Sequence, residues 1–150
     1  MKIAIDHTTR YVYDDQDRLA YRISADGRVS SYSYDIFGNV TKTADFSADF
    51  YPAGTTAVLM SDVATWLAGL AHRDQVEQSR STYDARGNLL QKVNFARALA
   101  GGGTDMDGGY RRTNYIYDQA GQLLKRTVKG ENAEQFIYDG LGRMTASTDV

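Results

Sequence analysis

The sequence has no cysteine and a single proline, Pro52, among its 150 residues. The lack of cysteine excludes a disulfide framework and any thiolate site. The scarcity of proline leaves few interruptions to strand pairing. Acidic and basic residues are interspersed and nearly balanced, with a formal net charge of −2, which gives no electrostatic reason to expect binding to nucleic acid or to an anionic membrane.

Long apolar segments are also missing. No stretch approaches the roughly 20 apolar residues that a transmembrane helix needs. The first six residues, MKIAID, form too short an apolar run for a signal peptide. We therefore predict no membrane span and no signal peptide within this segment.

A Tyr-Asp pair recurs five times, each time followed by turn-prone residues, a polar residue and an aliphatic one. A local motif repeated along a chain is typical of repeat proteins and determines the fold before any residue is considered for chemistry. We therefore predict that residues 1–150 form a single repeat segment. The pairs begin at Tyr13, Tyr34, Tyr83, Tyr117 and Tyr138.

Each unit is predicted to be a β-hairpin. Aspartate at the first turn position and glycine at the fourth fit a type I turn, in which the carboxylate accepts bonds from backbone N–H groups two and three residues on. Glycine supplies the positive φ of a three-residue loop, and Asp17, which replaces it in the first unit, tolerates that conformation. The predicted turn residues are Asp14, Asp35, Gly38, Asp84, Gly87, Asp118, Gly121, Asp139 and Gly142.

The turn also sets the register of each hairpin, because it places the tyrosine opposite the aliphatic residue. The predicted pairs are Tyr13–Leu19, Tyr34–Val40, Tyr83–Leu89, Tyr117–Leu123 and Tyr138–Met144. Since each of these tyrosines has an aliphatic partner across the hairpin, we expect the tyrosines to pack as core residues. Exposed tyrosines that stack on sugar rings are the alternative.

The predicted fold class is mainly β, an array of antiparallel hairpins in a curved, open sheet with one short helix in an insertion. The helix is expected at about 62–72, capped by Ser61 or Asp62, with residues 74–78 as a possible extension. A second, glycine-rich insertion is expected to be a flexible, exposed loop. The hairpins are placed near 11–23, 32–43, 81–94, 113–128 and 135–147, and the insertions at 44–80 and 95–110.

Candidate catalytic and metal-binding residues are few. Asp105 and Asp107 lie in the glycine-rich insertion but lack the further ligands of a calcium loop, and His7 and His72 have no second ligand at metal spacing. The five repeated aspartates are better explained as turn-closing residues than as paired catalytic carboxylates. We predict no enzyme activity, no catalytic residue, no metal and no cofactor.

The unit Tyr-Asp-x-x-Gly-(Arg/Asn)-(Leu/Val) resembles the YD repeat of bacterial RHS-repeat proteins, which is similar to repeats in the C component of insecticidal toxin complexes and in teneurins. The resemblance implies hairpins joined in a sheet that spirals into a hollow shell around a toxin domain. It also implies a structural, non-catalytic segment of a larger secreted or cell-surface bacterial protein. The family's Asp-Pro-x-Gly core motif and a variable toxin domain are missing from this sequence, so no cleavage residue or toxic activity is carried over.

The open edges of such an array need partners, since unpaired strands favour association. No polar capping unit is visible at either end, so we expect the segment to be an excerpt from, or a remnant of, a longer array. The expected partners are further repeats of the parent chain or a second copy of the segment, with a toxin domain enclosed. A carbohydrate-binding module is the first alternative, and an enzyme within the insertions is the second.

Overall fold

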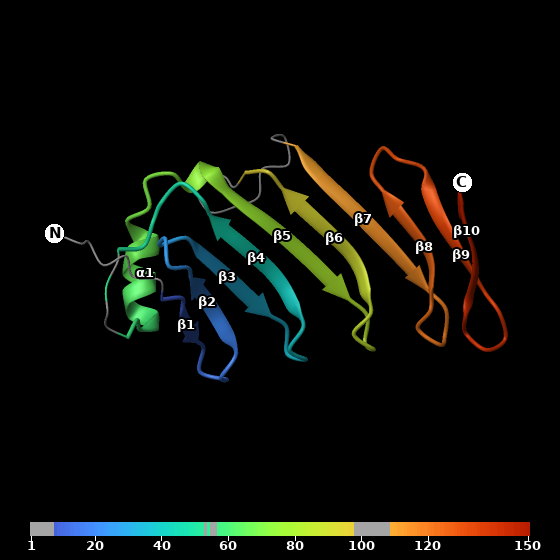
Figure 1. Cartoon of the computed structure of the whole chain (residues 1–150), viewed down its shortest axis with the longest axis horizontal. Coiled ribbons are helices and arrows are strands. Elements are labelled where there is room, and N and C mark those ends of the chain that lie inside the picture. Colours follow the sequence, from blue (N-terminus) through green and yellow to red (C-terminus); the bar gives the residue numbers. More distant parts are fainter. Residues whose placement is uncertain (1–7, 53, 55–56, 98–108) are drawn as a thin grey trace.

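The computed structural model describes residues 8–52, 54, 57–97 and 109–150. These residues form one antiparallel sheet in which ten strands follow one another in chain order (Figure 1). The predicted fold class, a mainly β array in an open sheet with a short helix, is therefore confirmed. The strands are β1 (Arg10–Tyr13), β2 (Leu19–Ile23), β3 (Val29–Tyr34), β4 (Val40–Phe46), β5 (Val76–Tyr83), β6 (Leu89–Phe95), β7 (Tyr110–Tyr117), β8 (Leu123–Val128), β9 (Ala133–Tyr138) and β10 (Met144–Asp149).

Five hairpins make up the sheet, and each joins an odd-numbered strand to the next strand in the chain. All five tyrosines are paired with the aliphatic residues predicted from the sequence. The register shifts beside the pair in each hairpin. Such a bulge is expected where a left-handed residue closes a three-residue loop; here the left-handed residue is Asp17 with φ 57° in the first hairpin and glycine in the other four.

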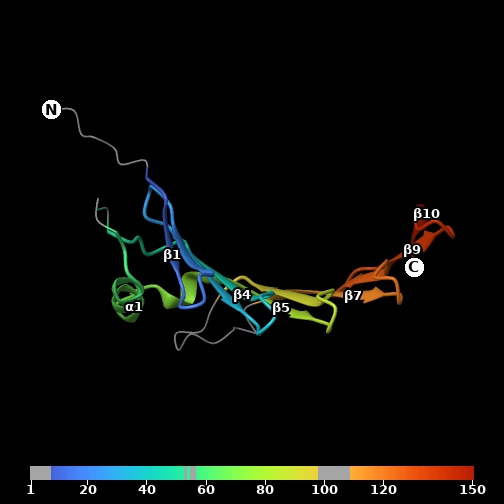
Figure 2. The same cartoon turned by 90° about the horizontal axis from the view of Figure 1, so that it is seen from below.

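The N-terminal end of the sheet has a covered face. Val12, Ile23 and Val29 lie in register on this face and are buried against Val63 of helix α1 (Met60–Ala68). The rings of Trp66 and Phe46 pack edge to face on the same side of the sheet, with ring centroids 5.6 Å apart. Figure 2 shows that the sheet is bent along its strand order and that α1 lies on the convex side.

The repeat tyrosines lie on the opposite, concave face. Side chains alternate between the two faces along each strand, and the tyrosines occupy positions that point away from the face of the buried valines. Tyr13 is 54% exposed, and the other four are half-buried. The expectation that they form the core is therefore wrong. The rings pack on neighbouring residues of the sheet, while valine, isoleucine and alanine form most of the buried core.

The helix is shorter than predicted and begins earlier. Asp62 does not cap it from outside but lies in its first turn, where the carboxylate accepts the Leu59 N–H at 2.9 Å. The helix ends before Gly69, its C-cap residue, and the guanidinium of Arg73 donates to the carbonyls of Leu67 and Ala68 at 3.0 and 2.8 Å. These bonds satisfy carbonyls that have no partner within the helix.

The possible extension of the helix over 74–78 is wrong. A short 3-10 helix (Arg73–Gln75) follows, and the chain then enters β5, which pairs with β4 over five residues. The hydrogen bonds of this pairing outweigh the weak helical pattern of the segment. Asp105 and Asp107, which were considered and set aside as calcium ligands, and His7 lie outside the described residues.

No helix among the described residues is long and apolar enough to span a membrane.

Candidate functional site

The five hairpin turns lie in a row at one end of the strands (Figure 1). We call this row the turn ladder, which consists of residues 14–18, 35–39, 84–88, 118–122 and 139–143. Because strands are about 4.8 Å apart and each unit contributes two strands, successive turns are about 10 Å apart along this row. This spacing allows long side chains of one turn to reach the next.

The aspartate of each turn closes it from inside. In the second turn, Asp35 Oδ1 accepts the backbone N–H groups of Phe37 and Asn39, both at 2.9 Å. The N–H of Gly38 donates instead to the Asp35 carbonyl, at 3.2 Å. The carboxylate therefore binds N–H groups two and four residues on, not two and three as predicted, because the third N–H is used by the type I turn itself.

The same pattern occurs in every turn, with distances from the carboxylate of 2.8 to 3.0 Å. In four turns the second carboxylate oxygen accepts a further bond from the side chain four residues on. The donors of that bond are Arg18, Asn39, Asn88 and Arg143.

In these four turns the bonds favour the ionised carboxylate and lower the pKa of the aspartate. The backbone N–H of Arg18 is the main cause of the lowered pKa of Asp14, and that of Arg143 has the same effect on the pKa of Asp139. The side-chain amides of Asn39 and Asn88 are the main causes of the lowered pKa of Asp35 and of Asp84, respectively. Ionisation and turn closure are thus coupled in these four turns.

Tyrosine hydroxyls connect one unit to the preceding one. Tyr34 donates to the carbonyl of Leu19 at 2.9 Å. Tyr83 donates to the carbonyl of Val40 at 2.9 Å, across 43 positions of sequence. Tyr138 donates to the carbonyl of Leu123 at 3.0 Å. In each case the acceptor is the aliphatic residue of the preceding unit, so the tyrosine pairs within its own hairpin and also binds the neighbouring hairpin.

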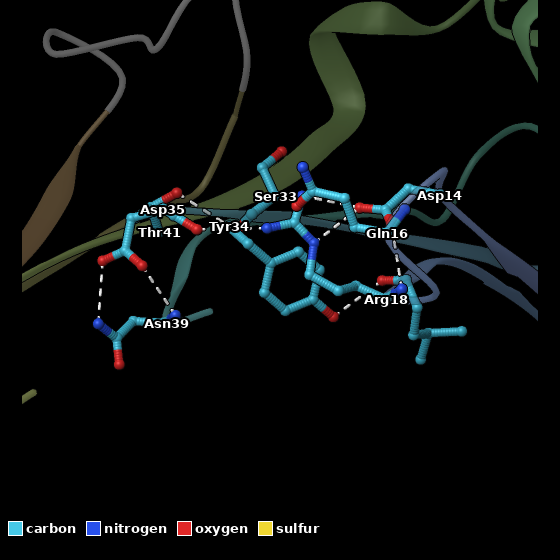
Figure 3. A network of polar contacts seen from close by, with 9 residues as sticks. Asp14, Gln16, Arg18, Ser33, Tyr34, Asp35, Asn39 and Thr41 are labelled. Carbon is cyan, nitrogen blue, oxygen red and sulfur yellow. Dashed lines mark hydrogen bonds and ion pairs between the residues drawn. The ribbon is translucent and has the colours of Figure 1, made fainter. Parts of the chain in front are cut away.

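Arginines connect turns in the opposite direction (Figure 3). Arg18 is held on Asp14 by Nε and Nη2, each 2.9 Å from Oδ2. Its Nη1 donates to the carbonyl of Asp35 in the next turn at 3.3 Å, and its guanidinium lies 4.9 Å from the ring centroid of Tyr34. Arg86 likewise donates to the carbonyl of Gln119 in the turn that follows.

The register between neighbouring units is constant. At each of the four junctions, the residue two positions after the aliphatic residue pairs with the residue three positions before the next tyrosine. At two junctions an insertion separates the paired strands in sequence, yet the register is the same as at the two junctions without an insertion. The pairs are Tyr21–Ser31, Lys42–Arg80, Gln91–Asn114 and Lys125–Gln135.

His72 has a structural partner in the first insertion. The carboxylate of Asp49 accepts the His72 backbone N–H at 2.9 Å and lies 3.1 Å from its Nδ1. Within the described ranges, no three histidine, aspartate or glutamate side chains lie close enough together to hold a metal ion.

A groove of about 300 Å³ runs between the C-terminal part of α1 and the sheet. Phe46, Leu67 and Leu70 line it together with Lys42 and Gln78. The hypothesis of an enzyme requires a polar cleft that joins both insertions. The groove contains residues of the first insertion, whereas residues 98–108 of the second are outside the described part of the chain.

All predicted repeat residues lie in the turn ladder or at the strand ends beside it. Sequence reasoning did not identify the acceptors of the tyrosine hydroxyls or the Arg18 contact with the next turn. A single repeat carries no signal for these contacts, because the acceptors are backbone carbonyls of a neighbouring unit. That the repeat residues hold the array together remains a proposal.

Comparisons with known proteins agree with the repeat pattern. A family model described as RHS repeat matches residues 13–56, which contain the first two turns of the ladder. No curated protein matches the chain significantly.

Among solved structures, that of TcdB2-TccC3 aligns with 97% of this chain at 18% identity and a TM-score of 0.45. The structure of TcdB2-TccC3-Cdc42 aligns with 99% at 16% identity and a TM-score of 0.46. This chain spans 8% of the length of each matched chain. The family match to residues 13–56 confirms the predicted resemblance of this chain to the RHS-repeat proteins.

Proposed function

We propose that the chain is a non-enzymatic wall segment of a β-sheet shell. In this proposal it belongs to a larger secreted or cell-surface bacterial protein whose repeats enclose or present a toxin domain. The residues of the turn ladder have structural roles, and none of them binds substrate or a cofactor.

The constant register between units is the observation that carries the proposal. Units joined in one register extend in a regular way, and their number is not limited by the contacts themselves. The insertion between Val40 and Tyr83 is accommodated without changing the register. The concave face, which carries the tyrosine rings, is the side on which a curved wall would enclose another domain (Figure 2).

The test is limited proteolysis of the complete gene product that contains residues 1–150. We expect the repeats to resist digestion as one unit and to protect the domain that they enclose, whereas the same domain produced alone is digested rapidly. A domain that is cut equally fast in both settings would contradict the enclosing role. Unchanged protection in a variant with Asp35→Ala and Asp84→Ala would contradict the role of the turn ladder.

Carbohydrate binding through tyrosines is a second candidate, favoured by the exposure of two rings at the N-terminal edge. Tyr11 and Tyr13 are 52% and 54% exposed, and they point to the same face because they are two positions apart on β1. Aromatic faces of this kind can stack on sugar rings. A glycan array with the double variant Tyr11→Ala/Tyr13→Ala and the control Tyr115→Ala tests this candidate. Binding that is lost in the double variant and kept in the control supports it, and no binding by the unaltered chain excludes it.

A further inference from the structure

The groove between α1 and the sheet is not explained by the proposed wall role. It lies on the convex face, opposite the face that would enclose a domain (Figure 2). Its volume of about 300 Å³ is at the lower end of the range for small-molecule sites. Phe46, Leu67 and Leu70 line it with apolar surface on which a hydrocarbon body can pack. The groove is therefore of the size and character that a small amphipathic molecule requires.

The charged residues that line the groove within the described chain are both cationic. They are Lys42 of β4 and Arg73 of the 3-10 helix. Arg80 lies directly opposite Lys42 on β5, and like charges in this position repel each other. The acidic residues of these two strands, Asp45 and Glu77, point to the opposite face of the sheet, because side chains alternate along a strand. The groove therefore has positive charge that no acidic residue among its described lining balances.

Two residues of the groove have polar groups with no hydrogen-bond partner in the described chain. Nη2 of Arg73 donates to the carbonyls of Leu67 and Ala68, whereas its Nε and Nη1 remain available. Gln78 is 7% exposed, and its buried Oε1 has no partner. Buried polar atoms nearly always have a partner in the protein or in bound water, so an atom without one is typical of a site that another molecule completes.

We propose that this groove binds a small amphipathic carboxylate, a molecule with a hydrocarbon body and one anionic end. The hydrocarbon body packs on Phe46 and the two leucines. The carboxylate accepts hydrogen bonds from Lys42 and from the available edge of the Arg73 guanidinium, whose planar donors match the two oxygens of a carboxylate. Because the guanidinium is already held by the end of α1, little side-chain freedom is lost on binding.

Fluorescence of Trp66 tests the proposal. It is the single tryptophan of the chain, and its ring packs edge to face with that of Phe46, which lines the groove. Titration of the unaltered chain with octanoate should therefore change the Trp66 emission to saturation in the millimolar range. NMR spectra of the same titration should show shifts of the Leu70 backbone amide and of the Gln78 side-chain amide. Absence of a saturable change in these signals would overturn the proposal.

The charge of the probe separates the proposed binding from simple hydrophobic association. Octanol has a similar body without the charge, and octylammonium has the opposite charge. Both should bind about three- to tenfold more weakly than octanoate, because neither can pair with the two cations. Equal affinity for the three probes would overturn the proposal.

A pair of lysine variants locates the anionic end of the ligand. Lys42→Gln removes the charge without breaking a hydrogen bond of the described chain, and it should weaken octanoate binding about three- to tenfold while octanol binding is unchanged. Lys92→Gln is the matched control, because Lys92 points to the opposite face of the sheet from Val93, the partner of Arg80. It should leave the binding of both probes unchanged. Equal effects of the two substitutions on octanoate binding would overturn the proposal.

Discussion

The two ends of the sheet share the same turns but differ in cover. At the N-terminal end, Ile23 and Val63 are completely buried between the sheet and α1. At the C-terminal end, all six residues of β10 are exposed. Even so, the turns of the first and last hairpins have the same carboxylate bonds and the same arginine contact. Turn geometry therefore does not depend on a hydrophobic core beneath it.

This difference indicates that the turn ladder and the helix-covered cluster have separate structural roles. The turn ladder fixes register and the direction in which units add, whereas the helix supplies the main buried apolar cluster. Stability should therefore be concentrated at the covered end, and the C-terminal hairpin should open first. The following experiments test that division, beginning with the largest expected effect.

Replacing Ile23 by alanine should cost about 2–5 kcal/mol, because the side chain is fully buried and its removal leaves a cavity. Met144→Ala at the uncovered end, where the side chain is 60% exposed, should change stability by about 0.5 kcal/mol or less. Urea unfolding of both variants measures the contrast. Similar losses in the two variants would show that the helix-covered cluster is not the main source of stability.

Two glycines with the same φ of 88° separate strain from packing. At Gly38 an added Cβ meets nothing within 4 Å, so Gly38→Ala should cost only the left-handed conformation, about 1–2 kcal/mol. At Gly27 the Cβ would lie 2.7 Å from the Tyr51 carbonyl oxygen, which belongs to the loop leading to α1. Gly27→Ala should therefore cost clearly more, as measured by the same unfolding assay. Equal costs would mean that the Tyr51 loop yields freely.

Removing one inter-unit hydroxyl should have a smaller effect. Tyr83→Phe loses the bond to the Val40 carbonyl and should cost about 0.5–1.5 kcal/mol. Tyr13→Phe removes a hydroxyl with no partner in the described chain and serves as the control. Hydrogen exchange of the β4 and β5 amides should increase in the first variant only. Equal exchange rates in the two variants would show that the Tyr83 hydroxyl does not help to join the units.

Acid should weaken the turn ladder. The pKa of Asp84 is lowered mainly by the amide of Asn88, so its folded pKa is below the ordinary value of 3.8. The stabilisation is fully present above that ordinary value and is lost as the pH falls through the lower, folded pKa. The urea midpoint should therefore decrease from pH 5 toward pH 3.

Asp84→Asn is the matched variant, because its amide oxygen can still accept the two backbone bonds but does not titrate. It should have a smaller decrease over the same pH range. An equal decrease in the variant and the unaltered chain would assign the acid sensitivity to other groups.

Much of the fold could be predicted because one local motif recurs. The Asp and Gly positions determined the turns, and the turns determined all five tyrosine–aliphatic pairs. The helix end was predicted too far along the chain, although Gly69, its C-cap residue, marks the end in the sequence. The burial of the tyrosines was also misjudged, since a cross-strand partner does not reveal which face of a sheet is covered.

The contacts between units were beyond the reach of the sequence for a different reason. The Tyr83 hydroxyl donates to the backbone carbonyl of Val40 across a long insertion. Because every residue type has a backbone carbonyl, this bond requires no particular residue at position 40. Lys42 and Arg80 have the same spacing from their repeat motifs as the paired residues at the other junctions. This common spacing can be recognised only once the pairing is known.

The most direct test of this common register is a disulfide between β4 and β5. Lys42→Cys and Arg80→Cys lie directly opposite one another across the first insertion, whereas Thr43→Cys and Arg80→Cys face opposite sides of the sheet. We predict rapid, intramolecular disulfide formation in the first pair and none in the second. A first pair that stays reduced under oxidation, or a second pair that closes equally fast, would contradict it.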